Sequence, residues 1–426
     1  MTVAETIAPV LNALVGEDSR VRIEFWDGSC LGPERGDSES PGTLRVLSSD
    51  AVSRILWSPN ELGLARAFVA GELEADGDFF AVLEALRGGA PRGLRFGLSA
   101  APLAVTAARG LDLVRRPPPP PPEEARLHGW RHSRRRDADA IGHHYDVGND
   151  FYRLVLGPSM TYSCARFSAD GMDLTDAQAS KHELICRKLG LPERKGARLL
   201  DVGCGWGSLA IHAASHYDVT AVGITISRSQ ADLARKRAAE AGVGDRVEIR
   251  LQDYRDLAGE QFDVISSIGM SEHVGAKNLV QYYTILQGAL RPRGRLLNHA
   301  ISSVGGSRMR RTSFIGRYVF PDGELIDVAA SVKAMEEAGF EIRDVESLRE
   351  HYARTLRAWV ANLEANWDEA IRLVGERRAR VWRLYMAGSA VGFTDGGINV
   401  HQVLGVVPTP DGDSGMPSTR HGWNTT

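Results

Sequence analysis

Residues 199–207 have the sequence LLDVGCGWG, in which three glycines (Gly203, Gly205 and Gly207) follow a short apolar run. A glycine-rich turn between a buried strand and a helix lets a ligand approach the backbone and leaves the first helical N–H groups free to bind it. Asp201 precedes the glycines, and the spacing D-x-G-x-G-x-G differs from the G-x-G-x-x-G of dinucleotide-binding turns. This segment predicts a strand, a ligand-binding turn and a helix.

Segments that favour strands alternate with segments that favour helices around this turn. Apolar runs predict strands at residues 197–202, 219–226, 247–251, 262–268 and 294–300. Apolar periodicity predicts helices from the turn to residue 216 and over 230–241. Such alternation is typical of a parallel sheet that is covered by helices on both faces. We therefore expect an α/β fold of the Rossmann-like type over residues 139–407.

The residues before this domain predict a smaller, mixed α/β domain over positions 1–112. Short apolar runs predict strands at 21–26 and 44–47, and the spacing over 61–86 predicts helix with breaks at Gly71 and Gly77. No cluster of His, Cys or paired acids occurs here, so we expect a structural or lipid-docking role. At the other end, residues 408–426 are polar and rich in Pro, Gly and Ser, which predicts a disordered tail.

Residues 113–138 predict a linker that is rich in proline and arginine. The consecutive prolines from Pro117 to Pro122 favour an extended polyproline II segment. Trp130 and many basic residues lie around them, namely Arg109, Arg115, Arg116, Arg126, Arg131, Arg134, Arg135 and Arg136. A basic run with an aromatic residue fits an anionic membrane surface, where each cation contributes about 1 kcal/mol, and a solvated linker is the alternative interpretation.

Composition argues against several classes of protein. The formal net charge of −3 gives no excess of positive charge for binding nucleic acid. The four cysteines form no CxxC pair, so the sequence predicts neither a disulfide framework nor a metal site. No apolar run reaches the ~20 residues of a membrane-spanning helix, and the first residues lack the basic start of a secretion signal. We therefore expect a cytoplasmic protein.

Polar residues follow the next two predicted strands and complete a candidate ligand site. Those after the second strand suit a ribose or an amino-acid group. Those after the third suit an adenine, because an Asp can accept from its amino group and a Tyr can cover its ring. The residues are Thr225, Ser227 and Gln230 in the first set and Gln252, Asp253 and Tyr254 in the second. In parallel sheets, ligands bind at the carboxyl ends of the strands, where these segments meet. The three segments resemble those of the class I S-adenosylmethionine (SAM) dependent methyltransferases.

Eight segments in order resemble the cyclopropane-fatty-acid synthase family. They are HHYDVGNDFY (143–152), MTYSC (160–164), LLDVGCGWGSLA (199–210), GITISRSQ (223–230), LQDYRDL (251–257), SIGMSEHVG (267–275), YVFPDGE (318–324) and HYARTLRAW (351–359). The family includes mycolic acid cyclopropane synthases and methyltransferases that make 10-methylene or 10-methyl (tuberculostearic-type) acyl chains. The resemblance covers residues 140 to 405, approximately, and implies a SAM-dependent enzyme that acts on the cis double bond of phospholipid acyl chains.

The resemblance also implies which residues bind SAM and which complete the reaction. The matching SAM-binding positions are Tyr162, Ser163, Asp201, Gly203, Gly205, Gly207, Thr225, Ser227, Gln230, Gln252, Asp253, Tyr254 and Ile268. The family uses bound bicarbonate as the base, and the matching positions are Cys164, Glu272 with its neighbour His273, His299, Ile301 and Tyr352. Glu272 would receive a hydrogen bond from bicarbonate, while His299 and Tyr352 would donate to it. The backbone at Cys164 and Ile301 would complete the site.

The carbocation that methyl transfer leaves on the acyl chain needs aromatic faces near it. Each such face stabilises a desolvated cation by about 1–2 kcal/mol. Candidates are Tyr318, Phe320, Tyr352, Trp359 and Tyr385. Ser389 stands where some family members carry a cysteine, which argues against a covalent thiol mechanism at this position.

Two products are compatible with these motifs. Loss of a methyl proton closes a cyclopropane ring, whereas a 1,2-hydride shift before that loss gives a 10-methylene branch, which a separate reductase can convert to a methyl branch. The MTYSCARF segment, the N-terminal extension and the Arg/Ala/Gly-rich composition favour the 10-methylene product. A small-molecule methyltransferase and a non-enzymatic lipid-binding protein are further alternatives. As partners we expect unsaturated phospholipids at the inner membrane face and no nucleic acid. Whether a separate reductase and a second copy of the chain are further partners is left open by the sequence.

Overall fold

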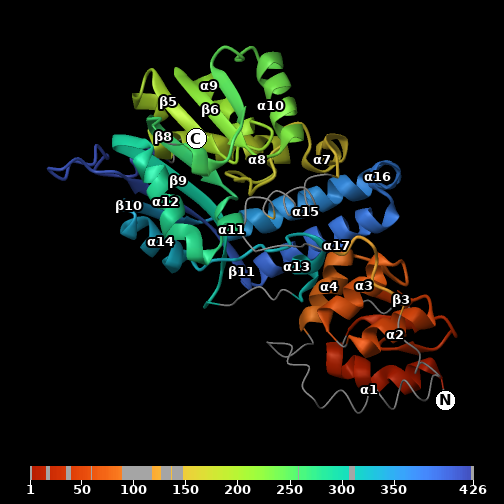
Figure 1. The fold of residues 1–426 in the computed structure, drawn as a ribbon. Coiled ribbons are helices and arrows are strands. Elements are labelled where there is room, and N and C mark those ends of the chain that lie inside the picture. The colour runs from red at the N-terminus through yellow and green to blue at the C-terminus, as the bar shows by residue number, and fades with distance from the viewer. Residues whose placement is uncertain are drawn as a thin grey trace. The chain divides into compact units, whose positions relative to one another are not determined.

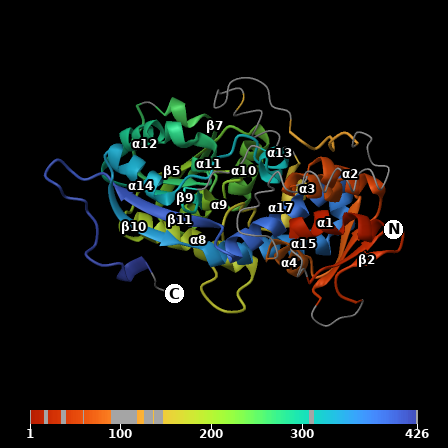
Figure 2. The same ribbon diagram turned by 90° about the horizontal axis from the view of Figure 1, so that it is seen from below.

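The computed structural model describes residues 2–15, 20–34, 40–58, 60–88, 118–125, 136, 147–257, 259–306 and 312–423. The chain forms two compact units (Figures 1 and 2). Unit 1 comprises Met1–Arg126, Arg310–Pro321 and Trp367–Val391, and unit 2 comprises Leu127–Met309, Asp322–Asn366 and Gly392–Thr426. Two segments that the sequence assigned to the Rossmann-like domain, 310–321 and 367–391, therefore group with unit 1. Most of the predicted linker, including Arg131, Arg134 and Arg135, lies outside the described residues.

Unit 1 contains a four-stranded mixed sheet with the order β2-β1-β3-β4. Its strands are β1 (Arg22–Phe25), β2 (Cys30–Leu31), β3 (Gly42–Val46) and β4 (Leu73–Gly77). Its helices are α1 (Val3–Val15), α2 (Ser49–Trp57), α3 (Glu61–Val69), α4 (Phe79–Gly88), α13 (Phe314–Tyr318), α16 (Trp367–Val374) and most of α17 (Glu376–Thr394). The helical region expected over 61–86 is broken at Gly71 and Gly77, as predicted, and the residues between the two glycines form a strand that the sequence did not predict. There, β4 pairs with β3, Leu73 opposite Val46, and Gly71 and Gly77 take the left-handed φ values that begin and end the strand.

The end of the proline run is anchored within unit 1. Prolines lack an N–H group, so their carbonyls have no partner within the segment itself. Arg54 on α2 supplies one, because its Nη1 donates to the carbonyls of Pro118 (3.2 Å) and Pro119 (2.9 Å). Arg66 on α3 forms a two-bond ion pair with Glu124 just after the run. These contacts fix residues 118–124 against two helices.

Unit 2 is built on a seven-stranded sheet with the order β10-β11-β9-β8-β5-β6-β7. Its strands are β5 (Ala197–Val202), β6 (Val219–Thr225), β7 (Val247–Leu251), β8 (Phe262–Ile268), β9 (Leu290–Ser303), β10 (Glu341–Ser347) and β11 (Ile398–Val406). Strands β5 to β9 are parallel, as the alternation predicted. Two further strands, β10 and β11, were not predicted from the sequence, and β11 runs antiparallel to both β9 and β10, so the complete sheet is mixed.

Helices cover both faces of this sheet, as Figure 1 shows. On one face, α8 (Leu174–Leu189), α9 (Ser208–His216) and α10 (Arg228–Glu240) pack on β5, β6 and β7. On the other, α12 (Leu279–Gly288) and α14 (Val328–Glu337) bury Tyr282, Leu286 and Met335. The remaining helices of unit 2 are α7 (Asn149–Leu156), α11 (Ser271–Val274) and α15 (Arg349–Ala365), with short 3₁₀ turns η1 (Leu191–Glu193), η2 (Tyr254–Asp256), η3 (Ala276–Asn278) and η4 (His421–Trp423). No helix among the described residues is long and apolar enough to cross a membrane.

The C-terminal segment is packed rather than disordered as far as Trp423, so the predicted tail was wrong there. Trp423 is only 7% exposed and joins the core cluster beneath α8, with Met416 beside it. Arg295 donates to the carbonyl of Gly415 (3.1 Å), and Arg420 forms an ion pair with Asp344 (3.2 Å). The tail was predicted to be disordered because its overall composition is polar, and composition does not show that a few of its residues pack against the rest of unit 2.

Candidate active site

A cavity in unit 2 lies at the carboxyl ends of β5, β6, β7 and β8. Of the SAM-binding positions expected from the sequence, it is lined by Tyr162, Ser163, Asp201, Gly203, Gly205, Thr225, Gln230, Gln252, Asp253, Tyr254 and Ile268. Two expected positions, Gly207 and Ser227, do not line it. Segments as far apart in the chain as Tyr162 and Ile268 therefore converge here, at the edge where parallel sheets bind their ligands.

The three glycines of the turn have different structural roles. All three have positive φ values, of 72°, 54° and 78° at Gly203, Gly205 and Gly207. A Cβ on Gly203 would lie 2.3 Å from the sulfur of Met270, and one on Gly207 would lie 3.2 Å from Cβ of Ala234 on α10. A Cβ on Gly205 would meet no protein atom within 4 Å. Gly205 is thus the position at which the backbone is open to a ligand in the cavity.

Asp201 is a buried acid at the end of β5. Its Oδ1 accepts a hydrogen bond from the hydroxyl of Ser266 on β8 (2.7 Å). Burial raises the pKa of Asp201 to about 6, and the Ser266 hydrogen bond and the charge of Lys181 oppose that rise. A carboxylate in this position can accept from a hydroxyl or ammonium group of a ligand in the cavity.

Two residues of α8 hold the loop that carries Tyr162 and Ser163. The ammonium group of buried Lys181 donates to Oγ of Ser163 (3.0 Å), and burial lowers the pKa of Lys181 to about 8. Gln178, one helical turn earlier, donates to the carbonyls of Thr161 (3.3 Å) and Ser163 (2.9 Å). This wall of the cavity is therefore fixed by side chains three residues apart on one helix face.

Arg237 on α10 ties the same loop to the glycine turn. Its Nη1 donates to the carbonyl of Trp206 (2.6 Å) and to Oγ of Ser208 (2.9 Å), and its Nη2 donates to the carbonyl of Ser159 (2.9 Å). Trp206 also donates from Nε1 to Oδ1 of Asn149 (2.8 Å), which belongs to the HHYDVGNDFY segment. The start of that segment, residues 143–146, lies outside the described residues. These contacts join two of the recognised motifs around one cavity.

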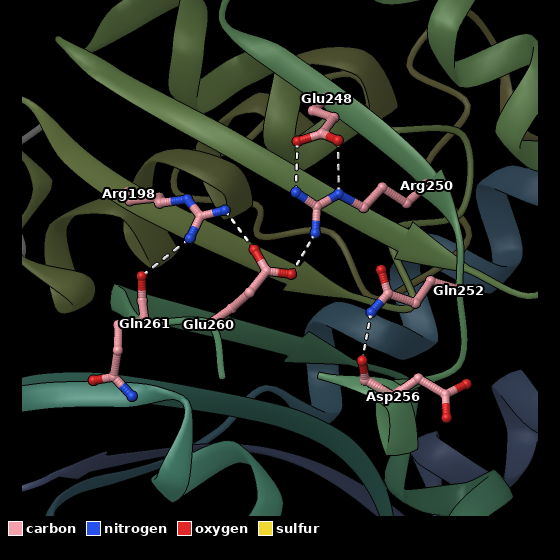
Figure 3. A network of polar contacts seen from close by, with 7 residues as sticks. All are labelled: Arg198, Glu248, Arg250, Gln252, Asp256, Glu260 and Gln261. Atoms are coloured by element: carbon pink, nitrogen blue, oxygen red, sulfur yellow. Dashed lines mark hydrogen bonds and ion pairs between the residues drawn. The ribbon is translucent and has the colours of Figure 1, made fainter. Parts of the chain in front are cut away.

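The loop after β7 is braced by charged and polar contacts. Arg250 forms a two-bond pair with Glu248 and also binds Glu260, which in turn accepts from Arg198 (2.6 Å) (Figure 3). Gln252 donates to the carbonyl of Asp256 (3.0 Å), also drawn in Figure 3. These contacts support the loop in which Asp253 and Tyr254 reach the cavity.

Asp253 is itself engaged by a neighbour in the loop. Both of its carboxylate oxygens accept from Arg255, at 2.8 Å from Nε and 2.7 Å from Nη2. The Tyr254 ring meets that of Tyr282 edge-on, with centroids 4.8 Å apart. A carboxylate held in this way keeps lone pairs for a further donor, as the sequence expectation requires.

The polar residues after β6 satisfy one another. The hydroxyl of Thr225 donates to Oε1 of Gln230 (2.9 Å), and both residues are buried at the cavity wall. Ser227 caps α10 by accepting from the backbone N–H of Gln230 (3.4 Å). Its position outside the cavity is explained by this capping role.

Of the five residues expected to hold bicarbonate, Glu272 and Ile301 are joined by a hydrogen bond, and Glu272 is the chain neighbour of the cavity-lining residue His273. Oε1 of Glu272 accepts from the backbone N–H of Ile301 (2.8 Å), and Oε2 of Glu272 is buried without a partner among the described residues. Burial raises the pKa of Glu272 to about 7. Nε2 of His299 is also buried without a partner, and burial lowers the pKa of His299 to about 3. The neighbouring Gly269, which lines the cavity, donates its N–H to the carbonyl of His299 (2.8 Å).

Cys164 and Tyr352 meet at the start of α15. The Cys164 thiol lies 3.6 Å from the carbonyl of Leu348, which also accepts from the backbone N–H of Tyr352 (3.1 Å). Burial raises the pKa of Cys164, so its thiol is neutral at pH 7. Cys164 is therefore a small, buried and neutral group, and the role of its backbone toward bicarbonate stays a prediction.

Aromatic rings extend from the cavity to Tyr352. The Tyr162 ring lies 5.3 Å from that of Trp359, and Trp359 lies 6.1 Å from Tyr352. The Tyr352 ring also packs against Phe393 at 4.6 Å. Of the predicted cation-stabilising residues, Tyr352 and Trp359 thus belong to this group in unit 2, whereas Tyr318, Phe320 and Tyr385 belong to unit 1.

Comparison with known proteins gives the family. Residues 132–403 match the family model of the mycolic acid cyclopropane synthetases. The chain belongs to that family. It is 41% identical over 412 residues to "Probable fatty acid methyltransferase Rv3720" of Mycobacterium tuberculosis, over 93% of each chain. It is 42% identical over 407 residues to a "Probable fatty acid methyltransferase" of Pseudomonas putida, over 94% of this chain and 95% of that one.

A solved structure shows the same fold. Mycolic acid cyclopropane synthase CmaA1, in complex with SAH and CTAB, is 34% identical and gives a TM-score of 0.59 over 63% of this chain and 97% of that chain. The present chain is therefore a SAM-dependent methyltransferase with a Rossmann-like α/β domain. The fold class and the enzyme class that the sequence predicted are both confirmed.

Several residues that line or support the cavity were not predicted from the sequence. Lys181, Gln178 and Arg237 lie inside helices whose pattern shows no feature beyond an ordinary polar face. Trp206 and Arg255 lie within two of the segments that resemble the family, and that position was the only indication in the sequence that they belong to the site. The cavity of the present chain is also lined by Met160, Thr161, His182, Met270, His273 and Asn278.

Proposed function

We propose that this chain transfers the SAM methyl group to the cis double bond of unsaturated fatty acyl chains in phospholipids, and that the product is a 10-methylene chain. The observation that carries the proposal is the pair of buried, unpartnered atoms beside the SAM cavity, Oε2 of Glu272 and Nε2 of His299. Buried polar atoms without a partner are rare in native proteins and indicate a missing ligand or water. Relatives named fatty acid methyltransferases support the substrate class.

The donor set fits bicarbonate. Because Ile301 already occupies Oε1 of Glu272, Oε2 is left as an acceptor for one hydroxyl group. A neutral His299 can present one N–H to an anionic oxygen. Bicarbonate has one hydroxyl and two oxygens that share the negative charge, and when bound it would supply the base for the proton that the cation loses. We infer that Glu272, His299 and Tyr352, with the backbone at Cys164, hold it, and that the N–H of Ile301 acts indirectly by orienting Glu272.

The aromatic group accounts for the reaction on an alkene. A carbon–carbon double bond is a weak nucleophile, so the methyl donor has to be held in line with it in a site without water. Trp359 is fully buried and Tyr352 nearly so, so their faces can stabilise the positive charge on the chain by about 1–2 kcal/mol each. The same site serves both products, because they differ only in whether a hydride shifts before the proton is lost.

Mass spectrometry of lipids from cells that express this chain tests the product. We expect acyl chains heavier by one CH2 unit, with a 10-methylene branch that a coexpressed reductase converts to a methyl branch. Cyclopropane chains that resist the reductase would establish the alternative product. Methylation of free polar acceptors without methylation of phospholipid vesicles would instead favour a small-molecule methyltransferase, and SAM binding without any turnover would favour a lipid-binding protein.

The arginines of the linker give a prediction about the membrane surface. Arg136 forms a two-bond ion pair with Asp322, so it is already engaged within the protein. We propose that Arg131, Arg134 and Arg135 contact anionic headgroups. Replacing all three with Gln should weaken binding to anionic vesicles by about 100-fold at low salt, at about 1 kcal/mol per cation, as measured by sedimentation. Arg136→Gln is the matched control and should bind vesicles as the wild type does. Equal vesicle binding by the triple variant would return the segment to a solvated linker.

The raised pKa of Glu272 predicts the pH dependence of turnover. A hydrogen-bond acceptor at Oε2 requires the ionised carboxylate, so turnover should rise with pH to a plateau, with a midpoint of about 7. Folding stability should change in the opposite sense. Between the ordinary pKa of 4.5 and about 7, the folded chain holds a proton that the unfolded chain releases, so stability falls as pH rises. The measurement is kcat from pH 5 to 9 with SAM saturating and bicarbonate held constant. A pH profile of kcat without a step near pH 7 would contradict the assignment of ionised Glu272 as the hydrogen-bond acceptor in the site.

A further inference from the structure

Gln402 on β11 lies directly opposite His299 on β9 in the antiparallel strand pair. Nε2 of its side-chain amide is 3.3 Å from Nδ1 of the His299 ring. Both side chains are buried, with exposed fractions of 0% for Gln402 and 2% for His299. Nε2, on the other side of the His299 ring, has no partner among the described residues. His299 therefore has one nitrogen held by the protein and one left available.

The chemistry of the two groups decides which ring nitrogen carries the hydrogen. A neutral imidazole has one N–H and one lone pair, and an amide NH2 group only donates. Burial keeps the His299 ring neutral, because the pKa falls far below 7. If the amide nitrogen of Gln402 donates to Nδ1, then Nδ1 carries the lone pair and Nε2 carries the hydrogen.

We propose that Gln402 is a positioning residue that fixes the tautomer of His299, so that Nε2–H faces the bicarbonate site as a donor. This inference rests on the proposed function and deepens it, since it assigns the donor in that site. The other tautomer would present a lone pair to an anionic oxygen, and the two would repel. With Nε2–H and Oε2 of Glu272 together, the site offers one donor and one acceptor, the pattern that suits a hydrogencarbonate ion.

Nuclear magnetic resonance of the ¹⁵N-histidine-labelled full chain reads the tautomer directly. Among the 12 histidines, the His299 signals are those that disappear in His299→Asn. In the wild type we expect a protonated Nε2 and an unprotonated Nδ1, and a protonated Nδ1 would overturn the proposal. This measurement needs no variant of Gln402 and does not depend on turnover.

Gln402→Met keeps the side-chain length and removes the amide donor. We expect a population with a protonated Nδ1 to appear, and the KM for bicarbonate to rise by roughly tenfold, as for loss of one hydrogen bond to a charged group. The Kd for SAM should stay within twofold, because Gln402 does not line the SAM cavity. An unchanged spectrum together with an unchanged KM for bicarbonate would overturn the proposal.

Ser302→Ala is the matched control. It removes a partly buried hydrogen bond of the same strand pair, between the Ser302 hydroxyl and Nδ1 of His401 (2.8 Å). Because side chains alternate along a strand, Ser302 lies on the opposite face of the sheet from His299. The His299 spectrum and the KM for bicarbonate should be those of the wild type, and a shift equal to that of Gln402→Met would show a general loosening of the strands and overturn the specific role. If wild-type turnover is independent of bicarbonate, the assignment of bicarbonate within the proposed function fails, while the spectra still decide the tautomer.

Discussion

Glu272→Gln should lower turnover by about 10²–10⁴-fold, the usual range for loss of positioned acid–base catalysis. The amide keeps the shape of the carboxylate, and its oxygen can still accept from the N–H of Ile301. The other position then holds an NH2 group, which only donates. The hydroxyl of bicarbonate loses its acceptor and meets a second donor, so the site no longer matches the ion.

The Kd for SAM should stay nearly unchanged in Glu272→Gln, because Glu272 does not line the SAM cavity. Calorimetry with SAM and a rate assay on vesicles of unsaturated phospholipid separate the two effects. Wild-type turnover should in addition depend on added bicarbonate after degassing. A variant that methylates phospholipid at the wild-type rate would contradict the assignment of Glu272.

Asp263→Asn provides a matched control for this substitution. Oδ2 of Asp263, which lies on β8, also accepts a backbone N–H, from Arg198 at 2.8 Å. It lies at the amino end of β8, whereas the cavity lies at the carboxyl ends of the strands. Its amide variant should keep both SAM affinity and turnover, which would show that the loss in Glu272→Gln comes from the site.

The central strands could be predicted because each is a short apolar run bounded by a turn. Strands β5, β7 and β8 have the bounds that the sequence predicts. Strand β11 was not predicted, and its antiparallel direction could not have been, because an apolar run carries no information about whether its neighbour is parallel. Strand β4 could not be predicted either, for a different reason. Its sequence LEADG has one strongly apolar residue, Leu73, and the strand forms because β3 offers a partner.

The candidate site could be predicted where its residues stand in strand ends and loops of recognisable spacing. Asp201, Gly205 and Asp253 are of this kind, and all three line the cavity. Lys181 and Gln402 are of another kind, since each stands among other polar residues in an ordinary helix or strand and belongs to no recognisable motif. Their roles arise from pairing across the fold, Lys181 with Ser163 and Gln402 with His299, and such pairs become visible only in three dimensions.

Gly205→Val should abolish SAM binding in a protein that remains folded. A Cβ at this position meets no protein atom within 4 Å, so the added side chain projects into the open cavity, where it would displace the cofactor. The left-handed φ of 54° adds a backbone cost of roughly 1–2 kcal/mol, which a folded domain can tolerate. Calorimetry should show no measurable heat of SAM binding, and circular dichroism should match the wild type. Near-normal SAM affinity in the folded variant would refute the placement of the cofactor.

Gly196→Val separates the two contributions. Gly196 precedes β5, has a φ of 73°, and likewise has no atom within 4 Å of an added Cβ. It does not line the cavity. The control therefore carries a similar backbone cost without the side chain in the site, and it should bind SAM as the wild type does. Equal loss of SAM affinity in both variants would mean that backbone strain explains the effect at Gly205. Loss at Gly205 alone would mean that the cofactor passes directly over this glycine, the close approach that its missing side chain permits.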